Sequence, residues 1–340
     1  MRDRRLTAAG VLIAAASVTL FVWALEQAGL EPVRAAAGRI GAGFIVIVLL
    51  GGLRGSCRAL AWTYAVGPQE RLTPWRAVTA YFAGEALGNI TPFGPLASEP
   101  VRIVLVNSQL AVGAALSARA VETMLYGVTI VLMWVIGAGT LLVAFSAPGA
   151  SKLTVGAMLV GAGAATLAAA WFVRAHGLVA RIVERLMASG VVPAMLEQAW
   201  VDLRRPGSGI LELVGRHPGR TLRILGLEAL YHVAAVAEIW VTLRLITGHA
   251  PTLPTALVLE CFNRAIMIGF QFVPMWLGVD EAGTGLVASA LHLGAATGVT
   301  LALVRKARII CWTAVGLLVA LAQGLTVGAG GVAPERPVSP

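Results

Sequence analysis

The sequence predicts an all-α, polytopic integral membrane protein. Its 340 residues are 58% hydrophobic and only 13% charged, and the mean hydropathy is +0.81. Soluble domains average about 45–50% apolar and about 25% charged residues. Apolar runs long enough to cross a bilayer recur along the chain, and a charged, proline-containing cluster interrupts them twice. We therefore expect about eight transmembrane or re-entrant helical segments, arranged as two pseudo-repeated halves with broken helices.

The first half, about residues 1–173, begins with an apolar run at 6–25 that is long for the core of a signal peptide, so we expect a retained first helix. The runs at 77–91 and 101–116 are short for complete spans and flank the first charged cluster. They predict either the two arms of a re-entrant hairpin or two tilted helices. The remaining runs of this half are 40–53 (extending towards Trp62), 118–145 and 153–173.

Residues 174–219 form the one extended polar stretch, and Pro and Gly interrupt its amphipathic pieces. This pattern predicts a surface-lying cytoplasmic linker. The second half, 220–328, contains apolar runs at 222–246, 254–273, 284–303 and 308–327. We expect residues 1–328 to form a single membrane domain, followed by a disordered tail at 329–340.

The net charge of +9 and the pI of about 10.5 are explained by topology. Lys and Arg collect in cytoplasmic loops of membrane proteins, and no basic stretch here is interleaved with aromatic residues, so no nucleic acid partner is expected. The N-terminus, the stretch 54–76, the linker and a basic turn at 305–308 are predicted to be cytoplasmic. The predicted location is the cell inner (plasma) membrane, with turns 146–152 and 247–253 facing outward.

The interrupting cluster occurs as EALGNITPFGPLASEPVR at 85–102 and as QFVPMWLGVDE at 271–281. In each copy a Glu follows a Pro by seven residues, and an amide side chain precedes that Pro by three. The pairs are Pro92 with Glu99 and Pro274 with Glu281. Proline-broken hydrophobic segments at corresponding places in two halves point to a transporter binding site.

Ionisable residues inside the hydrocarbon are costly and usually face a polar cavity or a partner. Arg102 is suited to a phosphate through bidentate bonds, and carboxylates to a cationic headgroup or to protons. The alternative is that Glu99, Asp280 and Glu281 merely cap helices at the membrane surface. The predicted substrate-binding residues are Glu85, Asn89, Glu99, Arg102, Arg119, Glu122, Gln271, Asp280 and Glu281.

Helical spacing also pairs Arg119 with Glu122, Glu260 with Arg264, and Glu228 with His232. For these pairs mutual neutralisation at a helix interface and a substrate role remain alternatives. One His with one Glu is too few for a metal site, and no Walker A or dinucleotide-binding pattern occurs. We therefore expect no metal, no cofactor and no catalytic residue.

The chain resembles the flippase-like membrane domain of lysylphosphatidylglycerol synthases, over about residues 5–328. The resemblance is carried by Gly84 to Arg102, Ala118 to Glu122, Pro274 to Glu281, and Arg305 to Trp312. It implies a polytopic inner-membrane protein that moves a lipid between leaflets. Full-length relatives move aminoacylated phosphatidylglycerol that a cytoplasmic synthetase domain makes. No such domain is seen here, so a stand-alone, non-enzymatic member is expected.

The leading function is therefore a lipid translocase for a phospholipid or another polar-headgroup lipid. Stand-alone relatives are associated with hopanoids and polyprenyl-linked sugars, so the resemblance implies no particular lipid. The alternatives are an ion-coupled transporter of a small soluble solute, a membrane-embedded lipid-modifying enzyme, and a partner subunit without activity of its own. The expected partners are the bilayer and a membrane lipid substrate, with a homo-oligomer or a lipid-synthesis protein as further candidates.

Overall fold

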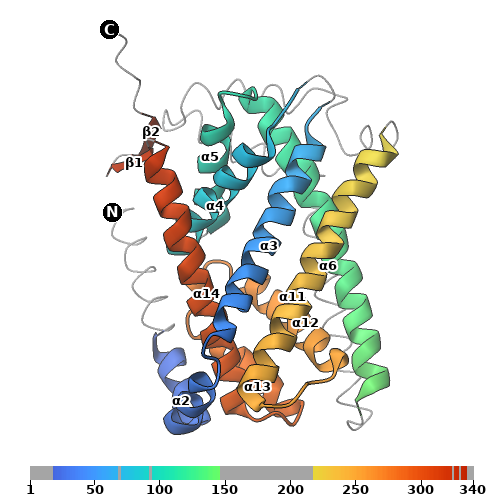
Figure 1. Ribbon diagram of the computed structural model, residues 1–340, viewed down its shortest axis with the longest axis vertical. Helices are drawn as coiled ribbons and strands as arrows, with labels where there is room; N and C mark the ends of the chain where they lie inside the picture. Colours follow the sequence, from blue (N-terminus) through green and yellow to red (C-terminus); the bar gives the residue numbers. More distant parts are fainter. Residues whose placement is uncertain are drawn as a thin grey trace, which may run out of the picture. The chain divides into compact units, whose positions relative to one another are not determined.

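The computed structural model describes residues 18–67, 70–91, 94–145, 217–323, 325–328 and 331–334. Within these residues the protein is helical apart from one short hairpin (Figure 1). The hairpin pairs β1 (Leu325–Gly328) antiparallel with β2 (Gly331–Pro334), in a region that the sequence predicts to be partly disordered. The predicted helix at 153–173, most of the predicted linker and the turn at 146–152 lie outside the described residues.

Helix lengths recur in the same order along the chain. A long helix, α3 (Gly43–Ala65), is followed by two short ones, α4 (Pro74–Ile90) and α5 (Gly94–Val106), and by the long α6 (Val112–Ala144). After the undescribed segment the order is α11 (Pro218–Thr247), α12 (Leu253–Gly269), the single 3₁₀ turn η1 (Pro274–Trp276), α13 (Val279–Ala290) and α14 (Ala295–Ala322). Each charged cluster of the sequence thus falls at the junction of two short helices.

Three helices in the described part are long and apolar enough to cross a membrane, namely α3, α6 and α11. The short helices are not. At about 1.5 Å per residue, α12 with 17 residues and α13 with 12 reach about 25 and 18 Å, against a hydrocarbon core of about 30 Å. Large apolar side chains such as Leu132 and Val143 remain exposed on α6, as expected for a surface in contact with lipid. The protein is a multi-pass helical membrane protein.

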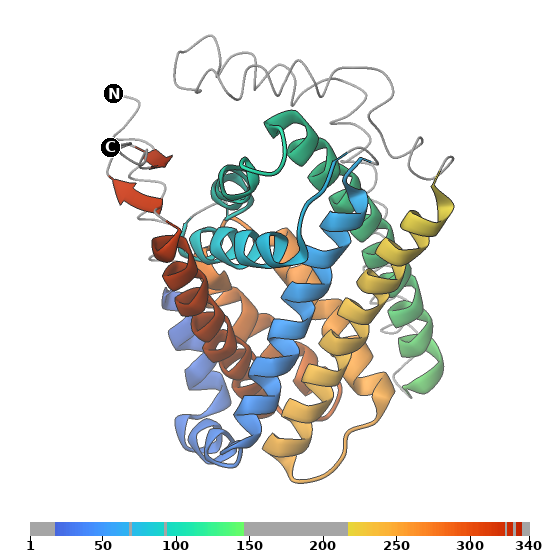
Figure 2. The ribbon, with the colours of Figure 1, turned by 45° about the horizontal axis from the view of Figure 1, so that its top comes forward.

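The described chain divides into two compact units. The first contains the described residues of 1–55, 81–101 and 232–340. Its core brings together apolar side chains from α3, α11, α12 and α14, including Ile47, Ile239, Leu259 and Leu301. The helical residues Val18–Ala28 and α2 (Leu30–Gly38) pack against α13 and α14, as Figure 2 shows for α2 and α14.

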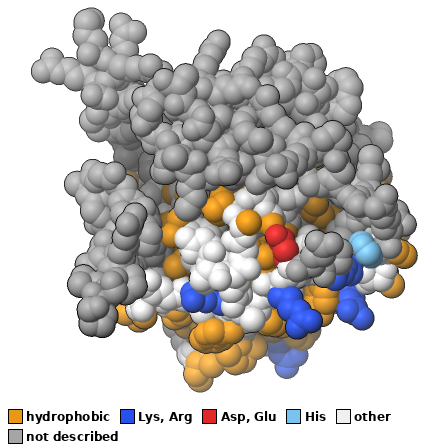
Figure 3. Space-filling model, turned by 90° about the horizontal axis from the view of Figure 1, so that it is seen from above, with side chains coloured by type: hydrophobic (Ala, Val, Ile, Leu, Met, Phe, Trp, Pro, Cys, Tyr) orange, Lys and Arg blue, Asp and Glu red, His pale blue; other side chains and the backbone are white. Residues whose placement is uncertain are grey.

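The second unit contains the described residues of 56–80 and of 102–231. It includes the C-terminal part of α3, all of α6 and the N-terminal part of α11. Arg220 at the start of α11 donates to the carbonyl oxygen of Val66 at 2.8 Å, beyond the end of α3. Trp62 and Trp134 are almost fully buried. Figure 3 shows one face of the protein, where the described Lys and Arg side chains gather beside hydrophobic ones.

One sequence prediction about basic residues is wrong, and two other basic residues lie in a helix rather than in a loop. The predicted turn at 305–308 lies in the middle of α14, and the chain instead turns before that helix, where His292 and Gly294 have φ of 60° and 84°. The predicted helices 284–303 and 308–327 are accordingly replaced by α13 and α14. Arg54 and Arg58, assigned to a cytoplasmic stretch, lie inside α3. The reason is that buried carboxylates neutralise these cations within the helices.

Candidate functional site

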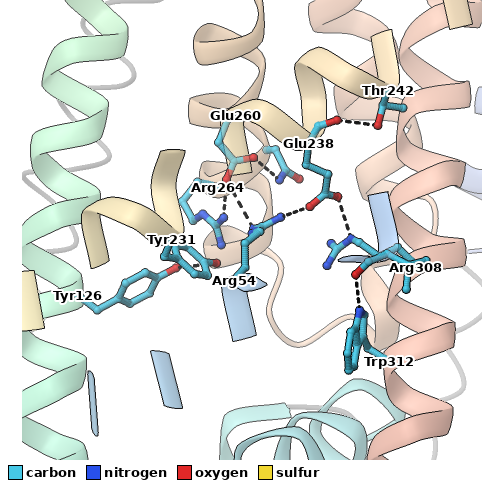
Figure 4. A network of polar contacts seen from close by, with 11 residues as sticks. Arg54, Tyr126, Tyr231, Glu238, Thr242, Glu260, Arg264, Arg308 and Trp312 are labelled. Atoms are coloured by element: carbon cyan, nitrogen blue, oxygen red, sulfur yellow. Dashed lines mark hydrogen bonds and ion pairs between the residues drawn. The ribbon is translucent and has the colours of Figure 1, made fainter. Parts of the chain in front are cut away.

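Arg54 is the centre of a buried ionic network in the first unit (Figure 4). Its Nη1 donates to Glu238 Oε2 at 2.7 Å, and its Nη2 lies 3.8 Å from Glu260 Oε1. Arg308 forms an ion pair with the other oxygen of Glu238, at 2.8 Å. Glu238 and Glu260 are each about 1% exposed, so these charges are withdrawn from the surroundings. Removing one partner of such a buried pair typically costs about 3–5 kcal/mol.

Small residues on α3 make room for the network. A Cβ atom at Gly51 would lie only 2.5 Å from Arg308 Cδ, so the glycine leaves room for the Arg308 side chain. One turn further along α14, Trp312 donates from Nε1 to the carbonyl oxygen of Val48 at 2.9 Å. Its ring also stacks on Phe82 of α4, with centroids 4.5 Å apart. These contacts hold the part of α14 that carries Arg308 against α3.

The Glu260 carboxylate is satisfied within its own helix. Arg264, four residues on, donates to Oε1, and Asn263 donates to Oε2 at 3.1 Å. The sequence prediction that Glu260 and Arg264 form a pair is therefore confirmed. Glu260 is consequently both a partner of its neighbours on α12 and the second carboxylate that Arg54 approaches.

The second broken segment carries another pair of acids, at the start of α13. Arg305 donates to Asp280 Oδ1 at 2.6 Å, and Thr284 donates to the same oxygen at 3.0 Å. Lys306 forms an ion pair with Glu281 Oε1 at 2.9 Å, while Glu281 Oε2 accepts from the backbone N–H of Gly278 at 2.7 Å. The predicted capping role of Glu281 is thus real, but the residue is buried and is also bound to a cation.

The backbone before α13 is strained. Met275 and Trp276 both adopt left-handed φ angles, 51° and 52°, which costs non-glycine residues on the order of 1–3 kcal/mol each. Two hydrogen bonds stabilise this shape: Lys306 donates to the carbonyl oxygen of Met275 at 2.8 Å, and the Trp276 indole donates to that of Met267 at 2.9 Å. Lys306 therefore connects the strained loop to Glu281.

The second unit contains a separate cluster around Glu122. Arg58 of α3 contacts Glu122 Oε1 through Nε at 2.8 Å and Nη2 at 2.7 Å, and Arg119 donates to Oε2 at 2.6 Å. Glu122 is fully buried. The predicted i,i+3 pairing of Arg119 with Glu122 is confirmed. The guanidinium of Arg58 also lies 3.6 Å above the ring of Tyr126.

The first broken segment is less completely described. Asn89 is buried and donates to Thr313 Oγ1 of α14 at 3.0 Å. Glu85 on α4 and Glu99 on α5 are half-buried, and Arg102, one turn beyond Glu99, is buried. Pro92, the residue that defines this copy of the cluster, lies outside the described residues. A substrate role for these side chains remains a prediction.

The predicted residues therefore form several groups. The structure brings together Arg119 with Glu122, and it places Asp280 beside Glu281 with a cation for each. Gln271, by contrast, is exposed. Sequence reasoning did not assign a site role to the basic residues that complete the clusters, which are Arg54, Arg58, Arg305, Lys306 and Arg308.

The sequence does contain an indication that these cations are buried. Each basic residue stands in a stretch that is otherwise apolar, which in a membrane helix indicates a buried partner. Among the residues that the structure describes, no group of three or more His, Cys, Asp or Glu side chains is arranged to hold a metal ion. The carboxylates and cations of these clusters can bind ionic groups and transfer protons.

Comparison with known proteins agrees with this architecture. Residues 7–318 match the family described as the lysylphosphatidylglycerol synthase TM region. A search of curated proteins found no significant match. A search of solved structures likewise found none. Because the matched region covers nearly the whole chain, the protein belongs to the lysylphosphatidylglycerol synthase TM region family.

Proposed function

We propose that the protein is a lipid translocase that moves a phospholipid or another polar-headgroup lipid between the leaflets of the inner membrane. Membership of the lysylphosphatidylglycerol synthase TM region family supports this proposal, because that membrane region is associated with lipid movement. The match covers the membrane region alone, so we assign the chain no aminoacyl transfer. The proposed orientation places the N-terminus in the cytoplasm, following the basic residues Arg2, Arg4 and Arg5.

The observation that carries the proposal is the buried ionic group at the break between α12 and α13. A lipid headgroup needs a polar environment within the membrane, and a short helix that starts there supplies unpaired N–H groups and the positive end of its dipole. Asp280 and Glu281 occupy the first turn of α13, and Arg305 and Lys306 neutralise them. A charged headgroup can replace one member of such a pair without leaving the other member unpaired.

The first broken segment supports the proposal by itself. Arg102 is buried on α5, one turn beyond Glu99, and a guanidinium binds phosphate through two parallel hydrogen bonds. In the repeated order of long and short helices, α5 and α13 occupy corresponding positions, and Glu99 and Glu281 each follow a proline by seven residues. Broken helices at corresponding places in two halves are the usual location of transporter substrate sites. We therefore assign headgroup binding to both segments.

The test is leaflet exchange of headgroup-labelled lipids in proteoliposomes that contain the purified full chain. Arg102→Ala and Glu281→Gln should each abolish exchange by the folded protein, because each removes a charge from a proposed headgroup contact. Arg34→Ala and Glu31→Gln are the matched controls, since both residues are exposed on α2, and these variants should exchange lipid as the wild type does.

The outcomes separate the function from the site. Exchange that persists in both Arg102→Ala and Glu281→Gln would refute the site assignment and leave the function standing. Absence of exchange for anionic, zwitterionic, hopanoid and polyprenyl lipids would refute the function. The result would then favour transport of a soluble solute, or a requirement for a homo-oligomer or a lipid-synthesis partner protein.

A further inference from the structure

Glu228 on α11 carries a buried carboxyl group that is not one of the proposed headgroup contacts. Its side chain is 0% exposed, and neither of its oxygens accepts a hydrogen bond from a donor in the described part of the chain. The nearest ion-pair contact is Arg58 Nε at 3.9 Å, and that Nε donates to Glu122 instead. An ionised carboxylate buried without donors is costly and tends to become neutral.

Glu122 holds the donors that Glu228 lacks. Its two oxygens accept from the guanidinium groups of Arg58 and Arg119 at 2.6–2.8 Å, and the Thr123 hydroxyl adds a weaker bond at 3.2 Å. Such short, charge-assisted hydrogen bonds stabilise the ionised form of a carboxylate. Of the two acids, Glu122 is therefore the one that carries negative charge.

Glu122 and Glu228 both approach Arg58, whose Nε lies 2.8 Å from Glu122 Oε1 and 3.9 Å from Glu228 Oε1. Two ionised carboxylates beside the same cation repel one another, which favours a proton on one of them. Because Glu122 is bound by two guanidinium groups, the proton belongs to Glu228.

Charged and phenolic side chains surround the Glu228 carboxyl group. In the described part of the chain, the titratable and charged groups near Glu228 include Cys57 and Arg58 from α3 and Arg119 and Glu122 from α6. Tyr126 of α6 lies under Arg58, and Tyr231 and His232 follow Glu228 on α11 by one turn. Tyr126 and Tyr231 connect their helices through their hydroxyl groups, at 3.4 Å. With Glu228 protonated, the four charged residues of the cluster sum to one positive charge. With Glu228 ionised, they balance.

We propose that Glu228 is a proton-binding site that couples lipid translocation to proton movement. In the release step the O–H bond of Glu228 breaks, the electron pair stays on the carboxylate, and the proton passes to water. The guanidinium of Arg58, 3.9 Å away, then shifts towards Glu228, while Arg119 remains on Glu122. Proton binding reverses the shift. Loss or gain of the proton thereby changes the contact between α3 and α11, which is the kind of local charge change that drives a two-state element.

The proton itself can be tested without any lipid measurement. Infrared spectra of the purified full chain should show the carbonyl stretch of a protonated carboxyl, shifted in D2O and absent from Glu228→Gln. Glu260→Gln is the matched control, because Glu260 is equally buried but is bound by Arg264 and Asn263, so this change should leave the band unaltered. A wild-type spectrum without a band assignable to Glu228 would overturn the proposal.

The coupling, which rests on the proposed translocase function, is tested in phosphatidylcholine vesicles with NBD-labelled phosphatidylglycerol or phosphatidylethanolamine. If one proton moves per lipid, a gradient of one pH unit should shift the steady-state leaflet ratio of the transported label by up to about tenfold. Glu228→Gln should exchange lipid without responding to the gradient. Glu228→Asp, which keeps an acidic proton, should retain the response, and the exposed control Glu31→Gln should match the wild type.

The two arms distinguish the failure of the coupling from the failure of the function. Wild-type exchange whose leaflet ratio ignores the gradient would overturn the coupling and leave the translocase standing. No exchange of either label by the wild type would overturn the translocase and the coupling together, while the infrared band still reports the proton on Glu228 independently. A gradient response that survives in Glu228→Gln would assign the proton to another group and overturn the proposal.

Discussion

The buried pair of Asp280 and Arg305 gives the most direct test of how much a buried ion pair contributes to the free energy of unfolding. Arg305 Nη2 lies 2.6 Å from Asp280 Oδ1, and both side chains are less than a tenth exposed. Thr284 connects the two, because its hydroxyl donates to Asp280 and accepts from Arg305 at 2.6 Å. The perturbations are Asp280→Ala, Arg305→Met and the two combined, where methionine retains most of the apolar stem of the arginine.

The expected magnitudes follow from charge pairing. Each single substitution leaves an uncompensated buried charge, which costs about 3–5 kcal/mol of the free energy of unfolding. The double variant leaves no charge behind, so its cost should be well below the sum of the two single costs. The resulting coupling energy should be on the order of 2–3 kcal/mol.

The assay is a reversible denaturant titration of all four proteins in mixed micelles, followed by the fluorescence of the native tryptophans. Arg34→Met on the exposed face of α2 is the control and should change the free energy of unfolding by less than about 0.5 kcal/mol. Additive costs for the two single substitutions would refute the reasoning. Costs below about 1 kcal/mol for each would do so as well, because the pair would then behave as an exposed salt bridge.

Two further predictions concern packing and the strained loop. Gly316→Val should destabilise the protein by about 1–3 kcal/mol or more, because the new side chain would overlap the carbonyl oxygen of Phe82; the melting temperature reports this. Gly139→Val, where the space is open, is its control, and equal melting temperatures for both variants would contradict the packing. Lys306→Met should accelerate hydrogen exchange in the loop before α13, because the loop and Glu281 lose a shared cation. Lys306→Arg should largely restore protection, and unchanged exchange in Lys306→Met would show that the loop does not depend on the lysine.

The extent to which the fold followed from the sequence depended on the length of each apolar run. The runs at 40–53 and 118–145 predicted α3 and α6, because a long stretch of apolar residues has few alternatives to a membrane helix. Residues 284–327 were divided at the wrong place. Three basic residues within four positions suggested a turn at a membrane surface, whereas in the structure they lie inside α14, where carboxylates on other helices neutralise them.

In the candidate site, some ion pairs could be predicted from sequence spacing and others could not. Pairs at i,i+3 or i,i+4 could be read from spacing alone, and the structure contains both Arg119–Glu122 and Glu260–Arg264. The Arg54–Glu238 pair spans 184 positions, so only the packing of α3 against α11 reveals it. The strained backbone before α13 was equally hidden, because Met275 is not a residue type that favours left-handed φ angles.

Two arginines one turn apart on α3 show why Glu228 differs from the other buried acids. Arg54 pairs with Glu238 at 2.7 Å and lies 3.8 Å from a second carboxylate, Glu260. Arg58 pairs with Glu122 at 2.7 Å and lies 3.9 Å from a second carboxylate, Glu228. The second carboxylates are not equivalent. Glu260 accepts hydrogen bonds from its own helix, whereas Glu228 accepts none from the described residues. The same arrangement around an arginine thus includes a carboxylate with donors in one cluster and a carboxylate without them in the other, and the proposed proton site rests on this difference.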